Sequence, residues 1–441
     1  MPATAYRSQI LYMRDDPRIA GEGDAVCYHR DGLIIVENGH VAAIGAYDEL
    51  APTLAKDVQV EHFDNALLTP GFIDTHVHFP QTDIIGAYGA QLLDWLNTYT
   101  YPAEAAFADR AHAENAAHFF VNELLRNGTT SALVFATSHE HSVDALFSAA
   151  LAKNMRLYTG KVLMDRNAPH DLCDGADLGR DATVRLIKRW QGKGRLGYAV
   201  TPRFAPTSSP EQLQMAGELL AAYPETRLQT HLSENKSEIE LAAQLFPQAR
   251  DYLDIYDRFG LLTERSVFAH SLHMEDDAFE RIAKADAAIS FCPTSNLFLG
   301  SGLFAIDAAR RANAQVSIGT DVGAGVSFSI LHTLKSAYKV GQLGGTSVDP
   351  FTLFYLATLG GAKALGVADK IGQLAPGAEA DFVVIDFSAT PLLDRRLRAA
   401  HDLKERLFAL MILGDDRAIS HTYIAGSCAH RRDAPDKKTA S

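Results

Sequence analysis

Short apolar runs alternate with longer segments of helical hydrophobic period through the middle of the chain. Eight of these runs are typical of buried strands, at residues 72–77, 131–136, 157–163, 198–201, 228–231, 267–270, 287–291 and 316–319. Helical patterns separate most of them, for example at 111–126 and 210–222. Eight strands alternating with helices over roughly 250 residues indicate an α/β fold of the (β/α)8 TIM-barrel type. An open doubly wound sheet is the alternative, but the glycine-rich nucleotide motifs that would support it are absent from the sequence.

The two ends of the chain differ from the middle, because short strand-like runs and turn residues dominate them. Near the start, apolar runs at 33–36 and 41–45 flank an Asn-Gly turn, which predicts a β-hairpin. Near the end, the runs at 381–386 and 422–426 predict further strands, and a polar tail follows. We therefore expect both ends to form one smaller β-sandwich beside a catalytic barrel. The expected limits are 1–69 and 371–441 for the sandwich and 70–370 for the barrel.

Composition narrows the classes of protein. The 441 residues are 47% hydrophobic and 22% charged, which suits a large core. A net charge of -13 disfavours nucleic acid and anionic membranes as partners, since both are polyanions. The four cysteines form no C-x-x-C pair, and a reduced setting is the simpler interpretation. Charges near the start interrupt any signal-peptide core, and no apolar run could span a bilayer, so we expect a cytoplasmic protein.

Histidine and aspartate, residue types that often bind metals, follow several predicted strands. His76 and His78 end the first barrel strand, and residues two apart on a strand point to the same face. His231, His270 and Asp321 directly follow three other strands. The C-terminal ends of barrel strands form one rim, where active sites lie. Neutral imidazoles with one carboxylate suit zinc or another borderline divalent ion, so the sequence predicts a metal site at this rim.

A second H-x-H pair, His139 and His141, is given a different interpretation. Ser138 before it is typical of a helix N-cap, so both histidines are expected to enter a helix. Residues two apart on a helix point in different directions and cannot share a metal ion.

Longer motifs resemble a known family. Residues 70–78 resemble the opening motif of the amidohydrolase superfamily, and the later histidines and aspartate follow in the order that it uses. No lysine convincingly ends the fourth strand, where two-metal members carry a bridging carbamylated lysine, and this favours the mononuclear, deaminase-like branch. Five further segments resemble the guanine deaminase family within that superfamily. They are 78–83, 91–102, 202–207, 230–235 and 291–296.

This resemblance, which covers nearly the whole chain, implies hydrolytic deamination of guanine to xanthine and ammonia. It implies one zinc ion per subunit, with iron(II) as the alternative ion, and a homodimer. The implied metal ligands are His76, His78, His231 and Asp321. The resemblance implies Glu234 as the catalytic proton shuttle. For the same reaction we expect Asp321 to accept the proton of the attacking water and His270 to hydrogen-bond that water. The implied substrate contacts are Gln81, Arg203 and Phe204.

Two alternatives stay open. The same chemistry on another amino-heterocycle, of the cytosine, adenosine or triazine type, is one, and Gln81 with Arg203-Phe204 favours guanine over it. A catalytically silent scaffold is the other, but loss of activity should appear as missing ligands, and none is missing. The small zinc deaminase fold that acts on nucleic-acid bases needs a P-C-x-x-C motif. It is excluded because this sequence has no C-x-x-C pair.

Overall fold

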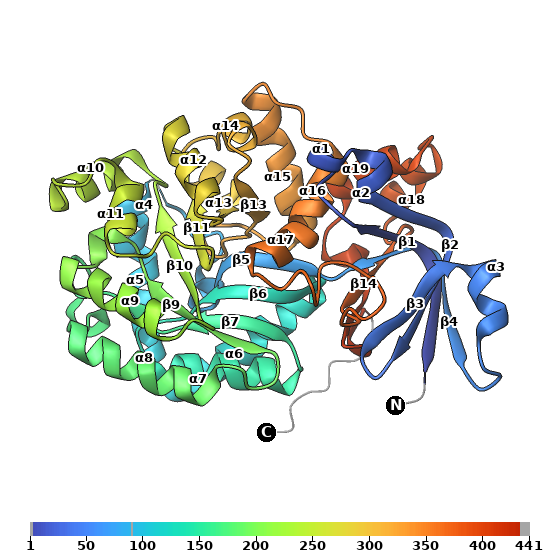
Figure 1. The fold of residues 1–441 in the computed structure, drawn as a ribbon, viewed down its shortest axis with the longest axis horizontal. Helices are drawn as coiled ribbons and strands as arrows, with labels where there is room; N and C mark the ends of the chain where they lie inside the picture. The colour runs from blue at the N-terminus through green and yellow to red at the C-terminus, as the bar shows by residue number, and fades with distance from the viewer. Residues whose placement is uncertain (1–2, 90, 433–441) are drawn as a thin grey trace.

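Eight parallel strands form a nearly closed barrel in the computed structural model, which describes residues 3–89 and 91–432 (Figure 1). In chain order they are β5 (Phe72–His78), β6 (Thr129–Phe135), β7 (Arg156–Gly160), β9 (Leu196–Pro202), β10 (Arg227–Leu232), β11 (Ser266–His270), β12 (Ala288–Phe291) and β13 (Gln315–Ile318). The short β8 (Val162–Leu163) pairs with β9. The chain after β13 meets β5, since Asp321 N donates to His76 O and His78 N to Val322 O, both at 2.8 Å. The predicted barrel is confirmed, and each predicted strand overlaps an observed one.

Most helices surround the barrel, and the others lie beside the strands formed by the two ends of the chain (Figure 1). The longer ones are α6 (Arg110–Arg126), α7 (Glu140–Ala152), α8 (Ala176–Trp190), α9 (Pro210–Ala222), α10 (Lys236–Leu245), α12 (Asp276–Lys284), α15 (Ile330–Leu343), α16 (Pro350–Ala357), α18 (Pro391–Arg398) and α19 (Leu403–Leu413). The shorter ones are α1 (Pro17–Ala20), α2 (Glu22–Ala25), α3 (Tyr47–Leu50), α4 (Leu92–Trp95), α5 (Tyr101–Ala105), α11 (Tyr252–Arg258), α13 (Pro293–Phe298), α14 (Ile306–Arg311) and α17 (Leu359–Ala364). The helices expected at 111–126 and 210–222 are α6 and α9.

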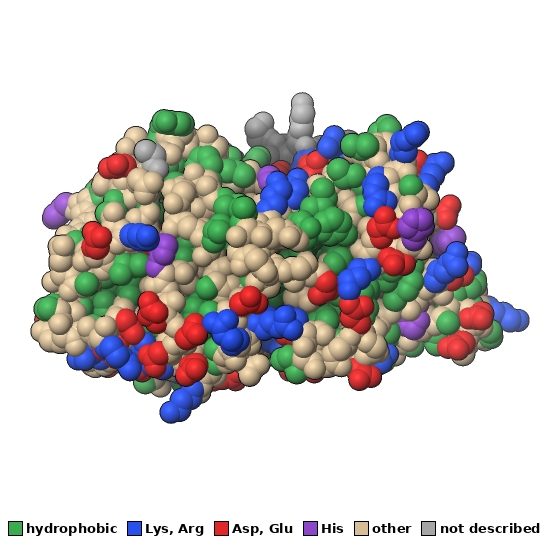
Figure 2. Space-filling model, turned by 90° about the horizontal axis from the view of Figure 1, so that it is seen from above, with side chains coloured by type: hydrophobic (Ala, Val, Ile, Leu, Met, Phe, Trp, Pro, Cys, Tyr) green, Lys and Arg blue, Asp and Glu red, His purple; other side chains and the backbone are tan. Residues whose placement is uncertain are grey.

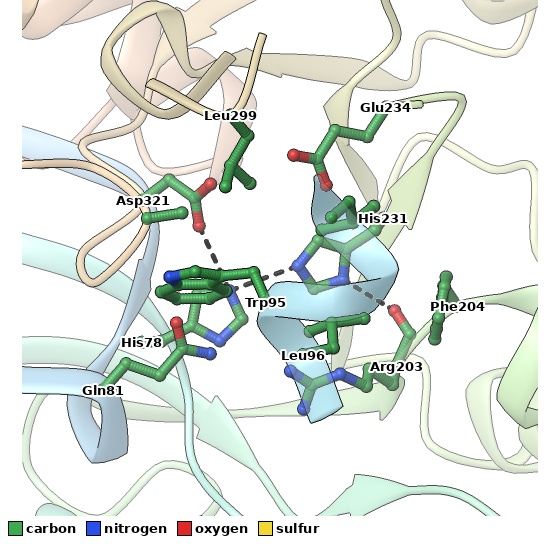
Figure 3. Close-up of a pocket in the computed structure, with 12 residues that line it drawn as sticks. His78, Gln81, Trp95, Leu96, Arg203, Phe204, His231, Glu234, Leu299 and Asp321 are labelled. Carbon is green, nitrogen blue, oxygen red and sulfur yellow. Dashed lines mark hydrogen bonds and ion pairs between the residues drawn. The ribbon is translucent and has the colours of Figure 1, made fainter. Parts of the chain in front are cut away.

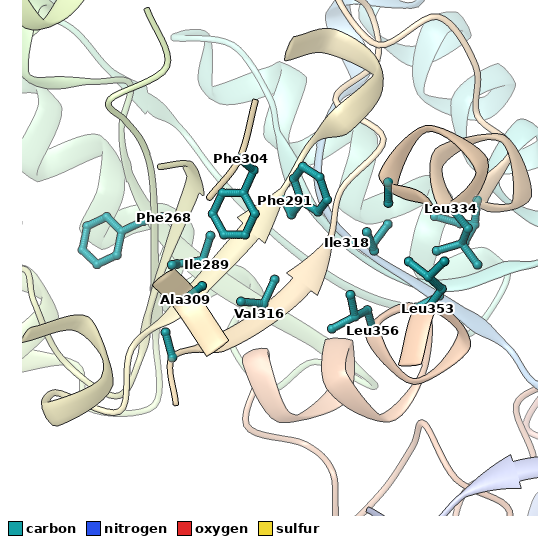
Figure 4. Close-up of a cluster of buried hydrophobic side chains, with 14 of the residues drawn as sticks. Phe268, Ile289, Phe291, Phe304, Ala309, Val316, Ile318, Leu334, Leu353 and Leu356 are labelled. Atoms are coloured by element: carbon teal, nitrogen blue, oxygen red, sulfur yellow. The ribbon is translucent and has the colours of Figure 1, made fainter. Parts of the chain in front are cut away.

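Apolar side chains fill the space between the strands and this helical layer (Figure 4). On the outer side of β12, the rings of Phe291 and Phe304 stack with their centroids 4.8 Å apart. Val316 of β13 and Leu353 and Leu356 of α16 are buried in the same cluster. Burying a side chain of this size stabilises a fold by about 1.5–3 kcal/mol, so this packing keeps the strand ends in place.

Both ends of the chain join in a second, mixed sheet, to the right in Figure 1. Its order is β16 (Ser427–Arg431), β15 (Ile419–Ile424), β14 (Phe382–Asp386), β4 (Gln59–Pro70), β1 (Thr4–Met13), β2 (Val26–Glu37) and β3 (His40–Ala46). The expected domain from both ends of the chain is confirmed, because β14 near the end pairs antiparallel with β4 near the start. All seven strands of the domain belong to one hydrogen-bonded sheet.

The local details of this sheet agree with the sequence in one place and not in another. The predicted hairpin is formed by β2 and β3, with Asn38 and Gly39 at φ 50° and 81°. The expectation of a polar tail directly after residue 426 is wrong, because β16 pairs with β15 there. β16 is an edge strand with no buried residue, so no hydrophobic alternation marks it. Residues 433–441 of the expected tail lie outside the described residues. The expected residue limits of the domains stay predictions.

Acidic and basic side chains are interspersed on the face shown in Figure 2, with no large patch of one sign. Within residues 3–89 and 91–432, no helix has both the length and the apolar character to cross a membrane. All four cysteines carry free thiols.

Candidate active site and metal centre

The end of β5 directs two imidazoles to one point. All of β5 is buried, and the Nε2 atoms of His76 and His78 lie 3.3 Å apart. Phe135, at the end of β6, packs against both rings with centroid distances of 5.2 and 4.6 Å. The alternation of side chains along a strand explains the convergence of the two histidines.

Three more strand ends bring possible ligands to the same place. His231 lies on β10, His270 ends β11, and Asp321 follows β13. His231 Nε2 is 3.2 Å from His78 Nε2, and Asp321 Oδ1 is 3.2 and 3.3 Å from the Nε2 atoms of His76 and His78. Ligand atoms of His76, His231, His270 and Asp321 all lie within 4.8 Å of one another. The structure thus gathers all five histidine and aspartate side chains that the sequence singled out at the rim.

The spacing of these atoms fits a divalent ion. Tetrahedral zinc sites have metal–ligand distances of about 2.0–2.2 Å, which place ligand atoms about 3.3–3.6 Å apart. Four of the six ligand-atom distances among His76, His78, His231 and Asp321 are 3.2–3.3 Å. His270 Nε2 stands farther away, 3.8 Å from Asp321 Oδ2. The described residues therefore hold a His/His/His/Asp group that can bind a metal ion, with His270 at its edge.

The protonation of the imidazoles also suits a metal. His231 Nδ1 donates to Arg203 O at 2.7 Å, which leaves the Nε2 lone pair directed at the cluster. Burial lowers the pKa of His231 well below its usual value and that of His78 to about 4. Metal ions bind the neutral imidazole, so burial keeps both rings in the required form.

Asp321 is held in an unusual backbone conformation. Its φ is 52°, in the left-handed region, which costs a non-glycine residue about 1–3 kcal/mol and is commonest at functional sites. Asp74 Oδ1 braces this end of the barrel by accepting from the backbone nitrogens of Thr320 at 3.1 Å and His76 at 3.2 Å. Burial alone would raise the pKa of Asp321, but the histidines, His76 first, hold it well below its usual range.

Glu234 lies on the loop between β10 and α10 and points into the same cavity (Figure 3). Its Oε2 is 3.4 Å from His270 Nε2. Asn296 Nδ2 is 2.9 Å from His270 Nδ1; with that amide nitrogen as the assigned donor, the imidazole proton sits on Nε2. Burial, followed by the charge of Asp321, raises the pKa of Glu234 well above its usual value. A carboxyl group in this setting is suited to giving and taking protons near neutral pH.

A cavity opens beside this cluster, with about 380 Å³ of empty space that includes its opening to solvent (Figure 3). Its polar lining residues are His78, Gln81, Arg203, His231, Glu234 and Asp321, and its apolar ones are Leu92, Trp95, Leu96, Phe204, Leu299 and Ala324. The predicted substrate contacts Gln81, Arg203 and Phe204 thus lie on the same cavity as the predicted catalytic Glu234. Flat apolar walls with a few convergent polar groups are typical of small-molecule sites.

One residue beside this cavity was not predicted from the sequence. Glu104 of α5 is fully buried, and both its oxygens lie 2.8 Å from Arg203 Nη1. Gln81 Nε2 also donates to Glu104 Oε1, at 3.3 Å. A glutamate on a five-residue helix carries no local signal for such a role, and its partner Arg203 is 99 positions away.

The H-x-H pair at 139–141 lies away from the cluster, but its expected cap is wrong. Helix α7 begins at Glu140, so His139 rather than Ser138 occupies the N-cap position, and His141 alone enters the helix. The hydroxyl of Thr137, two residues upstream, accepts from His139 N at 3.2 Å, which sets the helix start. His141 Nε2 is 2.6 Å from Phe107 O, whereas His139 Nδ1 is 3.1 Å from Thr137 Oγ1.

The barrel and its rim cluster define a class, the metal-dependent hydrolases built on a TIM barrel, and comparisons with known proteins agree. The model of the amidohydrolase family matches residues 67–428. Guanine deaminase of Escherichia coli (strain K12) is 48% identical over 409 residues, 93% of each chain. The solved structure of E. coli guanine deaminase has a TM-score of 0.95 at 46% identity, covering 98% of this chain and all of that one. The structure of guanine deaminase from C. acetobutylicum with bound guanine has a TM-score of 0.87 at 29% identity, covering 97% and 100%. The chain therefore belongs to the amidohydrolase family and, within it, to the guanine deaminases.

Proposed function

We propose that this enzyme hydrolyses guanine to xanthine and ammonia. The observation that carries the proposal is the shared cavity, which is lined by Glu234, by His78, His231 and Asp321 of the metal-binding group, and by Gln81, Arg203 and Phe204. Membership of the guanine deaminases supports the same substrate. The reaction consumes one water, replaces the exocyclic amino group of the purine by an oxygen and releases the nitrogen as ammonia.

We assign the metal to His76, His78, His231 and Asp321, on the spacing described above. Three imidazoles and a carboxylate suit zinc, with iron(II) as the alternative ion. A divalent ion bound there would lower the pKa of a bound water from about 15.7 to about 7.

Three side chains then handle protons. Asp321 accepts the proton of the attacking water, because its carboxylate is held ionised at the edge of the cavity. His270 Nε2, between Glu234 and Asp321 at 3.4 and 3.8 Å, orients that water by hydrogen bonding. Glu234 donates a proton to the ring nitrogen beside the attacked carbon. Its carboxylate then takes the remaining proton of the added water and passes it to the departing amine, and the proton held by Asp321 restores the acid form of Glu234.

The far side of the cavity selects the base. Phe204 offers a flat face for the purine, and Arg203 offers donors for its carbonyl oxygen. Gln81 has one amide hydrogen donated to Glu104 and its oxygen engaged by Gly323 N at 3.2 Å, which leaves one hydrogen and one lone pair for the substrate. Adenine lacks the carbonyl and would leave buried donors unpaired, so the site rejects it.

The test is incubation of the purified enzyme with guanine, adenine, cytosine and a triazine, following ammonia release and xanthine formation. We expect rapid xanthine formation from guanine alone, its loss after chelation and its return with added zinc. Ammonia from another heterocycle in preference to guanine would overturn the proposal, as would full activity in a metal-free enzyme. The homodimer and the cytoplasmic location stay predictions, which sedimentation and cell fractionation would test.

A further inference from the structure

Glu104 stands out because it is a buried charge outside the metal cluster. Its carboxylate and the guanidinium of Arg203 are both buried, and they form an ion pair inside the fold. Removing one partner of such a pair leaves the other charge buried without compensation. The intact pair has almost no net charge.

The surroundings make Glu104 the main balance for Arg203. Within the described residues, Glu104 is the one carboxylate in salt-bridge contact with Arg203. The Tyr101 ring, one turn away on α5, lies 5.5 Å from the guanidinium, and Asp321 acts on it more weakly. The wall that meets the purine carbonyl therefore carries no net charge while Glu104 is present.

Glu104 also fixes the other predicted contact with the base. It accepts from Gln81 Nε2 at 3.3 Å, while Gln81 Oε1 accepts from Gly323 N at 3.2 Å. These two bonds set which end of the Gln81 amide faces the cavity. One carboxylate thus holds both polar side chains of the substrate wall, which come from different barrel loops.

Resting on the function proposed above, we propose that Glu104 is a specificity-determining positioning residue that makes the site prefer a neutral purine over an anionic oxopurine. Replacing an amino group by a second carbonyl makes xanthine a stronger acid than guanine, so the product ionises first as pH rises. An unbalanced buried Arg203 would bind that anion through a charge-assisted hydrogen bond, roughly twice as strong as a neutral one. Neutralised by Glu104, Arg203 recognises the guanine carbonyl and lets the ionised product leave.

The experiment compares the zinc-loaded wild type with Glu104→Gln. Binding of xanthine is followed at pH 6 and pH 8.5 by the fluorescence of Trp95, which lines the cavity, and guanine kinetics are measured beside it. We expect Glu104→Gln to raise KM for guanine and to tighten xanthine binding by about tenfold at pH 8.5 relative to wild type, a change of about 1.4 kcal/mol. At pH 6 the tightening should be much smaller.

Matched variants separate charge from structure. Glu114→Gln, on an exposed position of α6, should change neither ligand. Glu104→Asp keeps the charge on a shorter arm, so it should weaken guanine without tightening xanthine. Glu104→Gln combined with Arg203→Gln removes both charges and should abolish the pH-dependent gain, and it serves as the test if the single variant misfolds. Parallel weakening of guanine and xanthine at both pH values would overturn the proposal, while a wild type inactive on guanine would instead overturn the proposed function.

Discussion

The two sides of the cavity are built in different ways. The metal side consists of residues on or just beyond the ends of barrel strands, such as His76, His231 and His270. The purine side draws on connecting segments, with Gln81 and Arg203 just after their strands and Glu104 and Trp95 on short helices over the rim. Strand ends are fixed by the hydrogen bonds of the whole barrel, whereas connecting segments depend on a few side-chain contacts. A fold of this kind can keep its metal chemistry constant while its substrate wall changes.

The largest effect should come from the metal side. Asp321→Ala removes both a proposed ligand and the proposed acceptor of the water proton, so activity should fall by more than the about 10²- to 10⁴-fold that a general base alone contributes. Zinc content, measured by metal analysis, should fall in the same preparation. Asp307→Ala, at an exposed position of α14, is the control. An Asp321→Ala enzyme with full zinc occupancy and rate would contradict the assignment.

Glu234→Gln should separate proton transfer from metal binding. The amide keeps the size of the side chain but cannot carry the proton, so kcat should fall by about 10²- to 10⁴-fold. Zinc content should be unchanged, because Glu234 is not one of the assigned ligands. Its carboxylate lies next to His270, which is not an assigned ligand either. Glu240→Gln, exposed on α10, is the control and should behave as wild type. Near-normal turnover would remove Glu234 from the proton path.

Phe204→Ala should affect the purine side alone. Stacking of a base on an aromatic ring contributes about 1–3 kcal/mol, so kcat/KM for guanine should fall by roughly 5- to 150-fold. The ring is buried on the cavity wall, where its centroid lies 6.4 Å from that of His231, and it offers no ligand atom, so metal content should stay constant. Phe204→Tyr keeps an aromatic face and should recover much of the loss. Equal kinetics for Phe204→Ala and wild type would place the purine elsewhere in the cavity.

The same contrast explains what the sequence could predict. Apolar runs with a terminal histidine or aspartate predict both the strand and the place of its last side chain, so the convergence of His76, His78 and His231 followed from periodicity. Gln81, Arg203 and Phe204 carry no such signal, and the resemblance alone singled them out. Neither periodicity nor the resemblance identified Glu104, because its burial depends on a partner distant in sequence. The predicted N-cap at Ser138 was wrong because His139 N donates to the hydroxyl of Thr137, so that α7 begins one residue later.

The smallest effect should come from the support of the metal side, at Glu238. Its Oε2 accepts from the backbone nitrogens of Glu234 at 2.9 Å and Asn235 at 3.1 Å, so it stabilises the loop between β10 and α10 that carries Glu234. Burial raises the pKa of Glu238 to about 7, above the value of about 4.3 for an unfolded chain. Between these pH values the folded state binds more protons than the unfolded state, so the wild type loses stability as pH rises. The amide in the Glu238→Gln variant cannot titrate yet can still accept both hydrogen bonds, so this variant should melt at a temperature that rises relative to wild type from pH 5 to pH 8. Melting curves at matched zinc content measure this, with Glu240→Gln as control, and parallel curves would mean that Glu238 titrates alike in the folded and unfolded states.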